Sequence, residues 1–236
     1  MSIKQDAKLR LQQKLFEKER RNLQRALPKA VKAAAKGSSW RVARGTLFQE
    51  RDGWFIQVHA FPWILEAKTP AELRFKPMGL DPLFWKILGM EANLDMPLSF
   101  RAFGAYTCRP PALRETDISE ENGSPERVAA NLLKWADEQF QSLNGSQTVS
   151  SFVEFIQTYP DHLNDGRYLT PLIVGMLLQG RDEEALSICR EARVRAGDSF
   201  LNDASGFIFS RAGEMITFTQ LAMEWITDKQ RSRTIN

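Results

Sequence analysis

The sequence predicts an α+β fold: a small, mostly antiparallel sheet with N-terminal helices, followed by an antiparallel helical C-terminal subdomain. Three observations lead to this class. Residues 45–63 combine a turn dipeptide with aromatic and branched side chains, which is typical of a β-hairpin. Residues 3–35 place sparse apolar positions among Lys, Arg and Gln, and the chain after residue 148 shows helical periodicity.

Polar breaks and charge divide the chain into expected parts. These are basic N-terminal helices at 1–39, a sheet region at 40–145 and a helical subdomain at 146–236, although 40–236 also fits one compact domain. Residues 1–44 hold thirteen Lys and Arg against three Asp and Glu, a net charge of +10. The rest of the chain carries a net charge of −7, so a basic arm precedes an acidic body.

The hairpin is predicted to be the centre of the sheet. Asp52-Gly53 suits a two-residue type I′ turn, because both positions of that turn need a positive φ. Strands are expected on either side, at 46–51 and 54–61, with large apolar groups on both faces. We therefore expect both faces of the hairpin to be at least partly covered.

The N-terminal segment is predicted to form two helical pieces that separate at Pro28, because proline fits a first helical turn and not an interior. Its basic face allows two interpretations, contact with nucleic-acid phosphates or a solvated helix surface. The residues of this face are Lys14, Lys18, Arg20, Arg21 and Arg25.

Further elements follow from local pattern. A half-buried strand is expected at 71–78, with Leu73 and Phe75 facing inward and Lys76 on the wet face together with Glu72 and Arg74. Asp81 is expected to cap a short helix, and another strand is expected at 98–108. Amphipathic helices are predicted at about 124–143, 149–159, 168–179, 182–196 and 214–227, and the tail at 228–236 is expected to fray.

The sequence contains no motif that predicts catalysis. Its two histidines, His59 and His162, form no HxH or HExxH pattern, and Cys108 and Cys189 are isolated from each other. Phosphate-binding loops and a nucleophile elbow are also missing from the sequence. We therefore expect no catalytic residues, no metal and no cofactor, and a cytoplasmic protein that is not an enzyme, without a membrane-spanning segment or signal peptide.

An acidic loop at 114–125 holds the strongest candidates for binding a partner. Glu115, Asp117, Glu120 and Glu121 lie within seven residues of each other. Carboxylates in this arrangement can meet a basic surface, where charge complementarity raises the association rate and selects the partner. The same acids are also compatible with a loop that is charged for solubility.

The order of these segments resembles that of bacterial immunity proteins encoded beside polymorphic or type VI secreted toxins. The resemblance is one of layout, carried by GTLFQERDGWFIQVHAF, LRFKPMGLDPLFWKILGM and LLQGRDEEALSICREA across residues 40–195. It implies a small α+β protein without catalytic residues that binds a cognate toxin and covers its active site. The basic N-terminal helix departs from this pattern.

Two other functions remain open from the sequence. The helical C-terminal half fits an adaptor or chaperone for a secreted effector, which would dock clients in a groove between helices. The basic N-terminal arm fits a nucleic-acid-binding protein whose affinity falls with salt.

Overall fold

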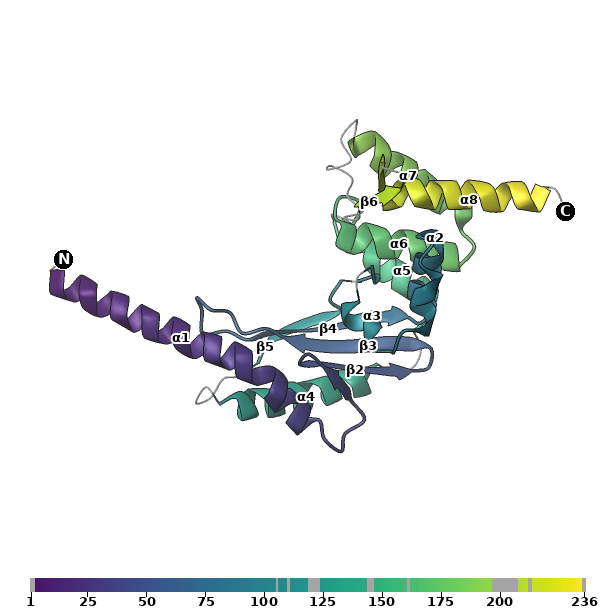
Figure 1. Cartoon of the computed structure of the whole chain (residues 1–236). Helices are drawn as coiled ribbons and strands as arrows, with labels where there is room; N and C mark the ends of the chain where they lie inside the picture. The colour runs from purple at the N-terminus through teal and green to yellow at the C-terminus, as the bar shows by residue number, and fades with distance from the viewer. Residues whose placement is uncertain are drawn as a thin grey trace. The chain divides into compact units, whose positions relative to one another are not determined.

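The computed structural model describes residues 3–104, 106–109, 111–118, 124–143, 147–160, 162–196, 208–211 and 214–234. It confirms the α+β class, because a long helix and an antiparallel sheet precede a helical C-terminal part (Figure 1). The chain divides into two compact units. The first comprises 1–51, 56–75 and 112–144, and the second comprises 52–55, 76–111 and 145–236.

The sheet contains five strands in the order β1-β2-β3-β4-β5. Its elements, with the two helices of the first unit, are α1 (Ile3–Ala34), β1 (Arg41–Ala43), β2 (Thr46–Arg51), β3 (Trp54–Ala60), β4 (Pro70–Pro77), β5 (Arg114–Asp117) and α4 (Pro125–Ser142). Both β1–β2 and β4–β5 pair antiparallel. The predicted turn is confirmed, since Asp52 and Gly53 have φ values of 51° and 79°.

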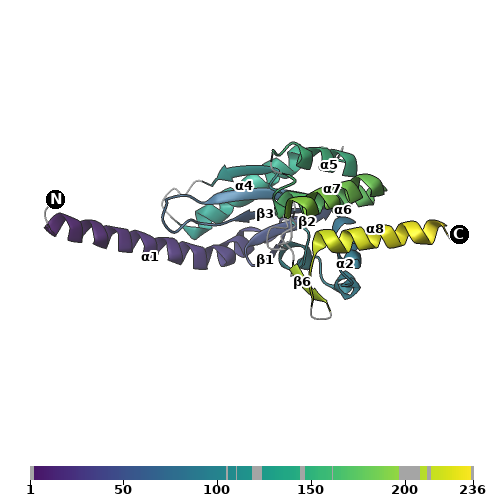
Figure 2. The ribbon, with the colours of Figure 1, turned by 90° about the horizontal axis from the view of Figure 1, so that it is seen from above.

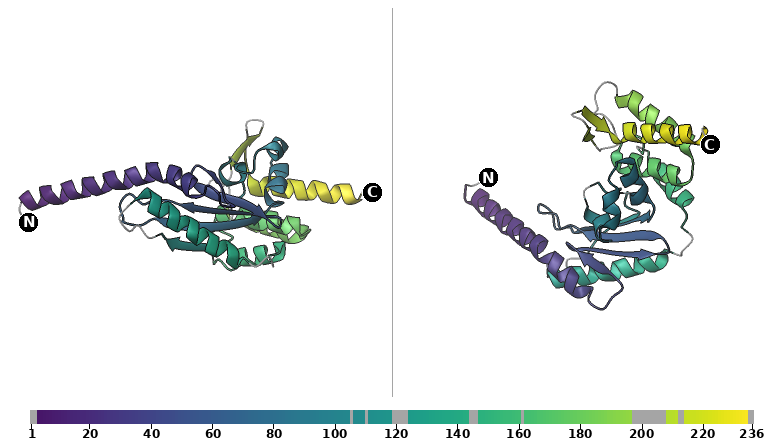
Figure 3. Two further views of the ribbon diagram at one scale, coloured as in Figure 1. Left: turned by 90° about the horizontal axis from the view of Figure 1, so that it is seen from below. Right: turned by 45° about the vertical axis from the view of Figure 1, so that its right-hand side comes forward.

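Helices α1 and α4 pack against each other and form the helical layer of the first unit (Figure 3). The core of this unit consists of aliphatic side chains from the helices and from alternate strand positions. Its central members are Leu23, Leu27, Val31, Leu47, Val58, Leu73, Val128 and Leu132, all of which are buried. Trp40, which follows α1 in the chain, packs on α4, because its indole N–H donates to Asp137 at 2.8 Å and its ring meets Phe140 edge-on.

The prediction of two N-terminal helical pieces is wrong, because α1 is one helix of 32 residues that contains Pro28. Proline removes one backbone hydrogen bond, but the flanking turns are held by burial of Leu27, Ala30 and Val31. Gly45, at a φ of 81°, lets the chain pass close to the proline ring, since a Cβ there would lie 3.0 Å from Pro28 Cα. Tertiary packing therefore outweighs the local helix-breaking tendency.

The second unit is mainly helical. It contains α2 (Leu80–Ile87), the 3₁₀ helix η1 (Glu91–Asp95), α3 (Phe100–Phe103), α5 (Val149–Gln157), α6 (Gly166–Leu178), α7 (Asp182–Ala196), β6 (Ile208–Arg211), β7 (Glu214–Thr217) and α8 (Phe218–Thr234). Each helix from α5 to α8 packs against the next one along the chain, as the pairs α5–α6, α6–α7 and α7–α8. Large buried side chains, including Phe84, Trp85, Phe152 and Phe218, fill its interior.

Several local expectations in this unit are wrong. The segment 98–108 is not a strand, because it contains α3 and an irregular connection. The expected helix at 214–227 begins with the strand β7 and continues as α8 through much of the expected tail. Asp81 does not cap α2, since the N-cap position is Gly79 and the Asp81 side chain is fully buried. Among the described residues, no helix combines the length and hydropathy needed to cross a lipid bilayer.

Candidate functional site

A row of polar side chains crosses the sheet of the first unit from β2 to its edge. The Thr46 hydroxyl and His59 Nδ1 lie 2.8 Å apart and share a hydrogen bond. The Phe61 N–H donates to the Pro70 carbonyl at 3.0 Å, a register that places His59 opposite Glu72. Glu72 is directly opposite Glu115 on β5. We call Thr46, His59, Glu72 and Glu115 the polar row.

The carboxylates of this face differ in their neighbours. Glu72 accepts from Arg74 Nε at 2.9 Å and from Arg74 Nη2 at 2.5 Å, so this pair is neutral overall. Glu115 and Asp117 are exposed, and neither forms an ion pair with any residue that the structure describes. Asp117 lies opposite Pro70, two positions along β5 from Glu115, and therefore points to the same face. Two unneutralised carboxylates thus mark this edge of the sheet.

The surroundings of His59 in this row favour its neutral imidazole form. Burial lowers its pKa from the usual 6.5, and the nearby Arg74 guanidinium acts in the same direction, while Glu72 opposes them. The ring stacks on Phe61 with centroids 5.8 Å apart. In the described part of the chain, no three His, Cys, Asp or Glu side chains are placed to hold a metal ion. This face carries charged and hydrogen-bonding side chains.

Strand β5 is the last strand of the sheet, and no described strand pairs with its outer edge. Its inner edge pairs with β4 from Pro70 to Leu73, so the outer N–H and C=O groups point away from the sheet. Arg114 ties the strand to α4, because it donates to the Ser142 hydroxyl at 2.9 Å and also to Gln139. An exposed, anchored edge strand is a template for pairing with another chain.

Of the four acidic residues predicted to bind a partner, the structure describes two. The structure brings Glu115 and Asp117 to one face of β5, which corrects the expectation of a loop for this part of 114–125. Glu120 and Glu121 lie outside the described residues. Sequence reasoning did not identify His59, Glu72 or Arg74 as neighbours of the acids. The alternating pattern of β4 was the available signal, since it placed Glu72 and Arg74 on the polar face.

A second cluster, formed by Lys76, Asp81, Arg101 and Cys108, contains residue types that occur in active sites, but its charged groups are bonded to one another inside the protein. Lys76 was expected on a wet face and is instead fully buried, where its ammonium donates to Asp81 at 2.9 Å and to the carbonyls of Arg101 and Cys108 at 3.0 and 2.7 Å. These bonds use all three of its donors. Asp81 also accepts from Arg101 Nη1 at 3.1 Å and from the Cys108 N–H at 2.9 Å. The cluster therefore fixes the irregular connection after α3 to β4 and α2.

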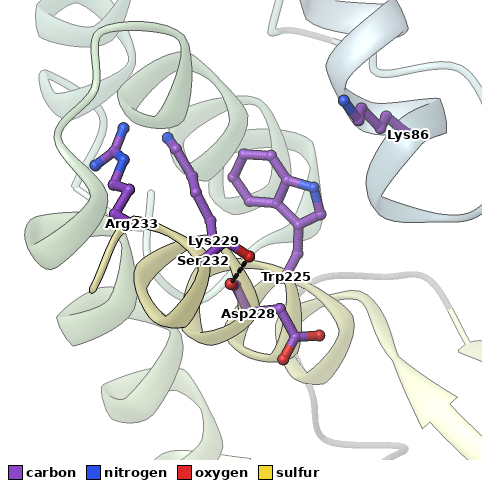
Figure 4. Close-up of a pocket in the computed structure, with 6 residues that line it drawn as sticks. All are labelled: Lys86, Trp225, Asp228, Lys229, Ser232 and Arg233. Carbon is purple, nitrogen blue, oxygen red and sulfur yellow. Dashed lines mark hydrogen bonds between the residues drawn. The ribbon is translucent and has the colours of Figure 1, made fainter. Parts of the chain in front are cut away.

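A groove of about 570 Å³ between α2 and α8 is lined by Lys86, Trp225, Asp228, Lys229, Ser232 and Arg233 (Figure 4). Two of its cations share one carboxylate as counter-charge. Lys229 and Arg233 lie 2.8 and 3.2 Å from the two carboxylate oxygens of Asp182, which is buried. Lys229 also lies over the Trp225 ring at 5.0 Å. These internal pairs leave the groove with little free charge for an anionic ligand.

The residues that the sequence assigned to a basic face of α1 are exposed, with one exception. Lys14, Lys18, Arg21 and Arg25 are exposed as expected. Arg20 is buried, which corrects its assignment to the basic face. It donates through Nε to the Trp63 carbonyl at 2.6 Å and through Nη2 to the Lys68 carbonyl. Arg20 therefore anchors α1 to the connection between β3 and β4.

Comparison with known proteins finds no matching family model, no similar curated protein and no similar solved structure.

Proposed function

We propose that this protein binds and inhibits a basic protein partner, in the manner of an immunity protein that covers the active site of a cognate toxin. The observation that carries the proposal is the edge strand β5, which exposes two carboxylates, Glu115 and Asp117, on one face. A toxin that acts on an anionic substrate presents a basic cleft. Paired carboxylates on a rigid strand are complementary to such a cleft.

Apolar anchors adjoin the acidic edge. The connection between β3 and β4 exposes Trp63 and Leu65, with 42% and 73% of their surfaces accessible. The Ile118 N–H donates to the Thr69 carbonyl at 2.9 Å, so this connection lies beside the end of β5. Exposed aromatic side chains beside charged groups are typical of binding hot spots. The surface thus combines a strand edge, two acids and an indole.

The position of the surface within the fold supports recognition by a preformed site. The polar row and the Glu72–Arg74 pair fix the strands beneath the acids, and Arg114 fixes β5 to α4. Little ordering is needed when a partner binds, which favours high affinity. In this proposal the protein acts in the cytoplasm, where an inhibitor protects the cell that produces the toxin, and it turns over no substrate.

The test is co-purification from the native host with the full chain as bait. We expect a stoichiometric basic protein whose activity is abolished in the complex, with a dissociation constant of about 1 nM or lower. The variant Glu115→Lys/Asp117→Lys should lower the association rate at least about tenfold, because it reverses the charge that steers the encounter. Binding kinetics at several salt concentrations measure this change.

The matched control is Glu138→Lys/Glu191→Lys, which makes the same charge change at exposed positions on α4 and α7. We expect this control to leave the association rate within about twofold of the parent. The proposal is wrong if the partner is acidic, if the two variants behave alike, or if the host yields no stoichiometric partner.

A further inference from the structure

Seven basic side chains form a continuous stripe along α1. We call Arg10, Lys14, Lys18, Arg21, Arg25, Lys29 and Lys32 the basic stripe, and all seven are exposed. Their successive spacings of four, four and three residues average close to the 3.6 residues of a helical turn, so the side chains stay on one face. At a rise of about 1.5 Å per residue the stripe is about 33 Å long.

The stripe exists because α1 is a single helix. Two helical pieces separated at Pro28 would have turned Lys29 and Lys32 away from the other members. In the described structure the helix continues from Ile3 to Ala34, so all seven cations share one direction. Because α1 is continuous, its basic residues lie on one surface of the helix.

The side of α1 opposite the basic stripe is packed against the first unit, which leaves the stripe facing solvent. Leu23, Leu27 and Val31 are buried in the core of the first unit. Arg20 donates to the Trp63 carbonyl, and Gln24 donates to the Pro62 carbonyl at 2.6 Å. Leu23, Leu27 and Val31 lie opposite the stripe, and Arg20 and Gln24 lie at the side of this buried face, so the helix is fixed in rotation and its cations face outward.

The charges of the stripe are largely uncompensated. Among the described residues, Arg21 is the member of the stripe that forms an ion pair, with Glu17 at 3.2 Å. Neighbouring cations three or four residues apart repel each other, and such pairs destabilise a helix. A polyanion bound along the stripe would relieve this repulsion and release its own condensed counterions.

We propose that the basic stripe binds the phosphate backbone of double-stranded nucleic acid without sequence preference. Its length matches about one turn of a duplex, roughly 34 Å, so cations along the stripe can meet phosphates on both sides of a groove. The N-terminal part of α1 is free all round, since residues 8–15 are all exposed, and Figure 2 shows this part running on past the strands. A helix about 10–12 Å across fits a major groove about 12 Å wide.

A membrane surface fits these observations less well. A helix that lies on a membrane needs a free apolar face beside its basic one. In α1 the apolar face is buried from Leu23 to Val31, and from residue 8 onward the large apolar residues that are exposed are Leu9, Leu11 and Leu15. These three do not share one face, because Leu9 continues the buried side whereas Leu11 and Leu15 lie beside the basic stripe.

The test is fluorescence anisotropy with a labelled DNA duplex of about 24 base pairs and mixed sequence, between about 50 and 200 mM salt. For the full chain we expect micromolar binding at the low end and a slope of log K against log salt of about −4 to −6, the value for several phosphate contacts. The variant Lys14→Gln/Lys18→Gln/Arg21→Gln/Arg25→Gln should reduce the slope by about 3 to 4 and weaken binding more than tenfold. Glutamine is also a good helix former, and far-UV circular dichroism checks that α1 is retained.

The matched control is Arg127→Gln/Lys134→Gln/Arg190→Gln/Arg231→Gln, which removes the same charge from exposed positions on other helices. We expect the control to bind like the parent, and we expect Glu115→Lys/Asp117→Lys not to weaken binding. The proposal is overturned if the duplex does not bind at about 50 mM salt, or if the control loses as much affinity as the stripe variant. Binding to vesicles of anionic phospholipid in place of the duplex would also overturn it.

Discussion

The ammonium of Lys76 lies 2.8 Å from Oδ2 and 2.9 Å from Oδ1 of Asp81, and the two side chains are 3% and 0% exposed. Lys76 is near the end of β4, and Asp81 is in the first turn of α2. The same two groups also bind backbone atoms of Cys108. One ion pair therefore joins a strand, a helix and an irregular connection in the second unit.

Removing one partner of this pair should be strongly destabilising. Asp81→Asn leaves the buried Lys76 ammonium without its counter-charge, and we expect the free energy of unfolding to fall by about 3–5 kcal/mol. Replacing all three charged groups, as Lys76→Met/Asp81→Leu/Arg101→Met, removes the unpaired charges as well, because Arg101 also pairs with Asp81, and should cost less than the single change. Urea unfolding followed by tryptophan fluorescence measures both. Equal stability of Asp81→Asn and the parent would contradict the structural role, and Lys134→Gln at the surface should change stability by less than about 0.5 kcal/mol.

The Cys108 thiol should be inert in the folded protein. Its side chain is fully buried, and burial raises its pKa above the usual thiol value, so the reactive thiolate is suppressed. We expect a thiol reagent at pH 8 to modify native Cys108 at least about a hundredfold more slowly than the urea-unfolded protein. A Cys189→Ala background isolates the signal. Asp81→Ala should speed the reaction, since it removes the oxygen that accepts from the Cys108 N–H.

His59 should make stability fall in mild acid. Its folded-state pKa is lowered from 6.5, mainly by burial, so the unfolded chain takes up a proton first as the pH falls. The contribution of His59 to the free energy of unfolding is fully present above about pH 6.5. It is lost as the pH falls toward the folded-state pKa, at up to about 1.4 kcal/mol per pH unit. Urea unfolding at pH 7.5 and 5.0 measures the loss, and His59→Gln should remove part of it. The change His162→Gln controls for loss of a histidine elsewhere.

Arg20 should hold α1 on the sheet. Arg20→Met removes the donors to the carbonyls of Trp63 and Lys68 while keeping most of the buried side-chain volume. We expect amide hydrogens of residues 60–69 and of the nearby turns of α1 to exchange faster, and stability to fall by about 1–3 kcal/mol. Hydrogen exchange with mass spectrometry locates the change. Arg25→Met, on the exposed side of α1, should leave exchange in these segments unaltered.

The sequence by itself determined the elements whose signals are local. The Asp52-Gly53 turn and its flanking strands were predicted correctly, because positive φ at both turn positions is a property of these two residues. The helices α4, α5, α6 and α7 follow their apolar periodicity, with ends within a few residues of those expected. The grouping of Glu115 with Asp117 also came from the sequence.

Tertiary structure alone decided which polar groups are buried and which segments become strands. Lys76 and Arg20 look like surface cations in the sequence, but long-range partners satisfy their donors inside the protein. Residues 114–117 have little intrinsic strand preference and become β5 because β4 offers a free edge. Helix α1 continues through Pro28 because neighbouring residues are buried against distant elements. Such outcomes depend on contacts between residues far apart in the chain, which a local pattern does not contain.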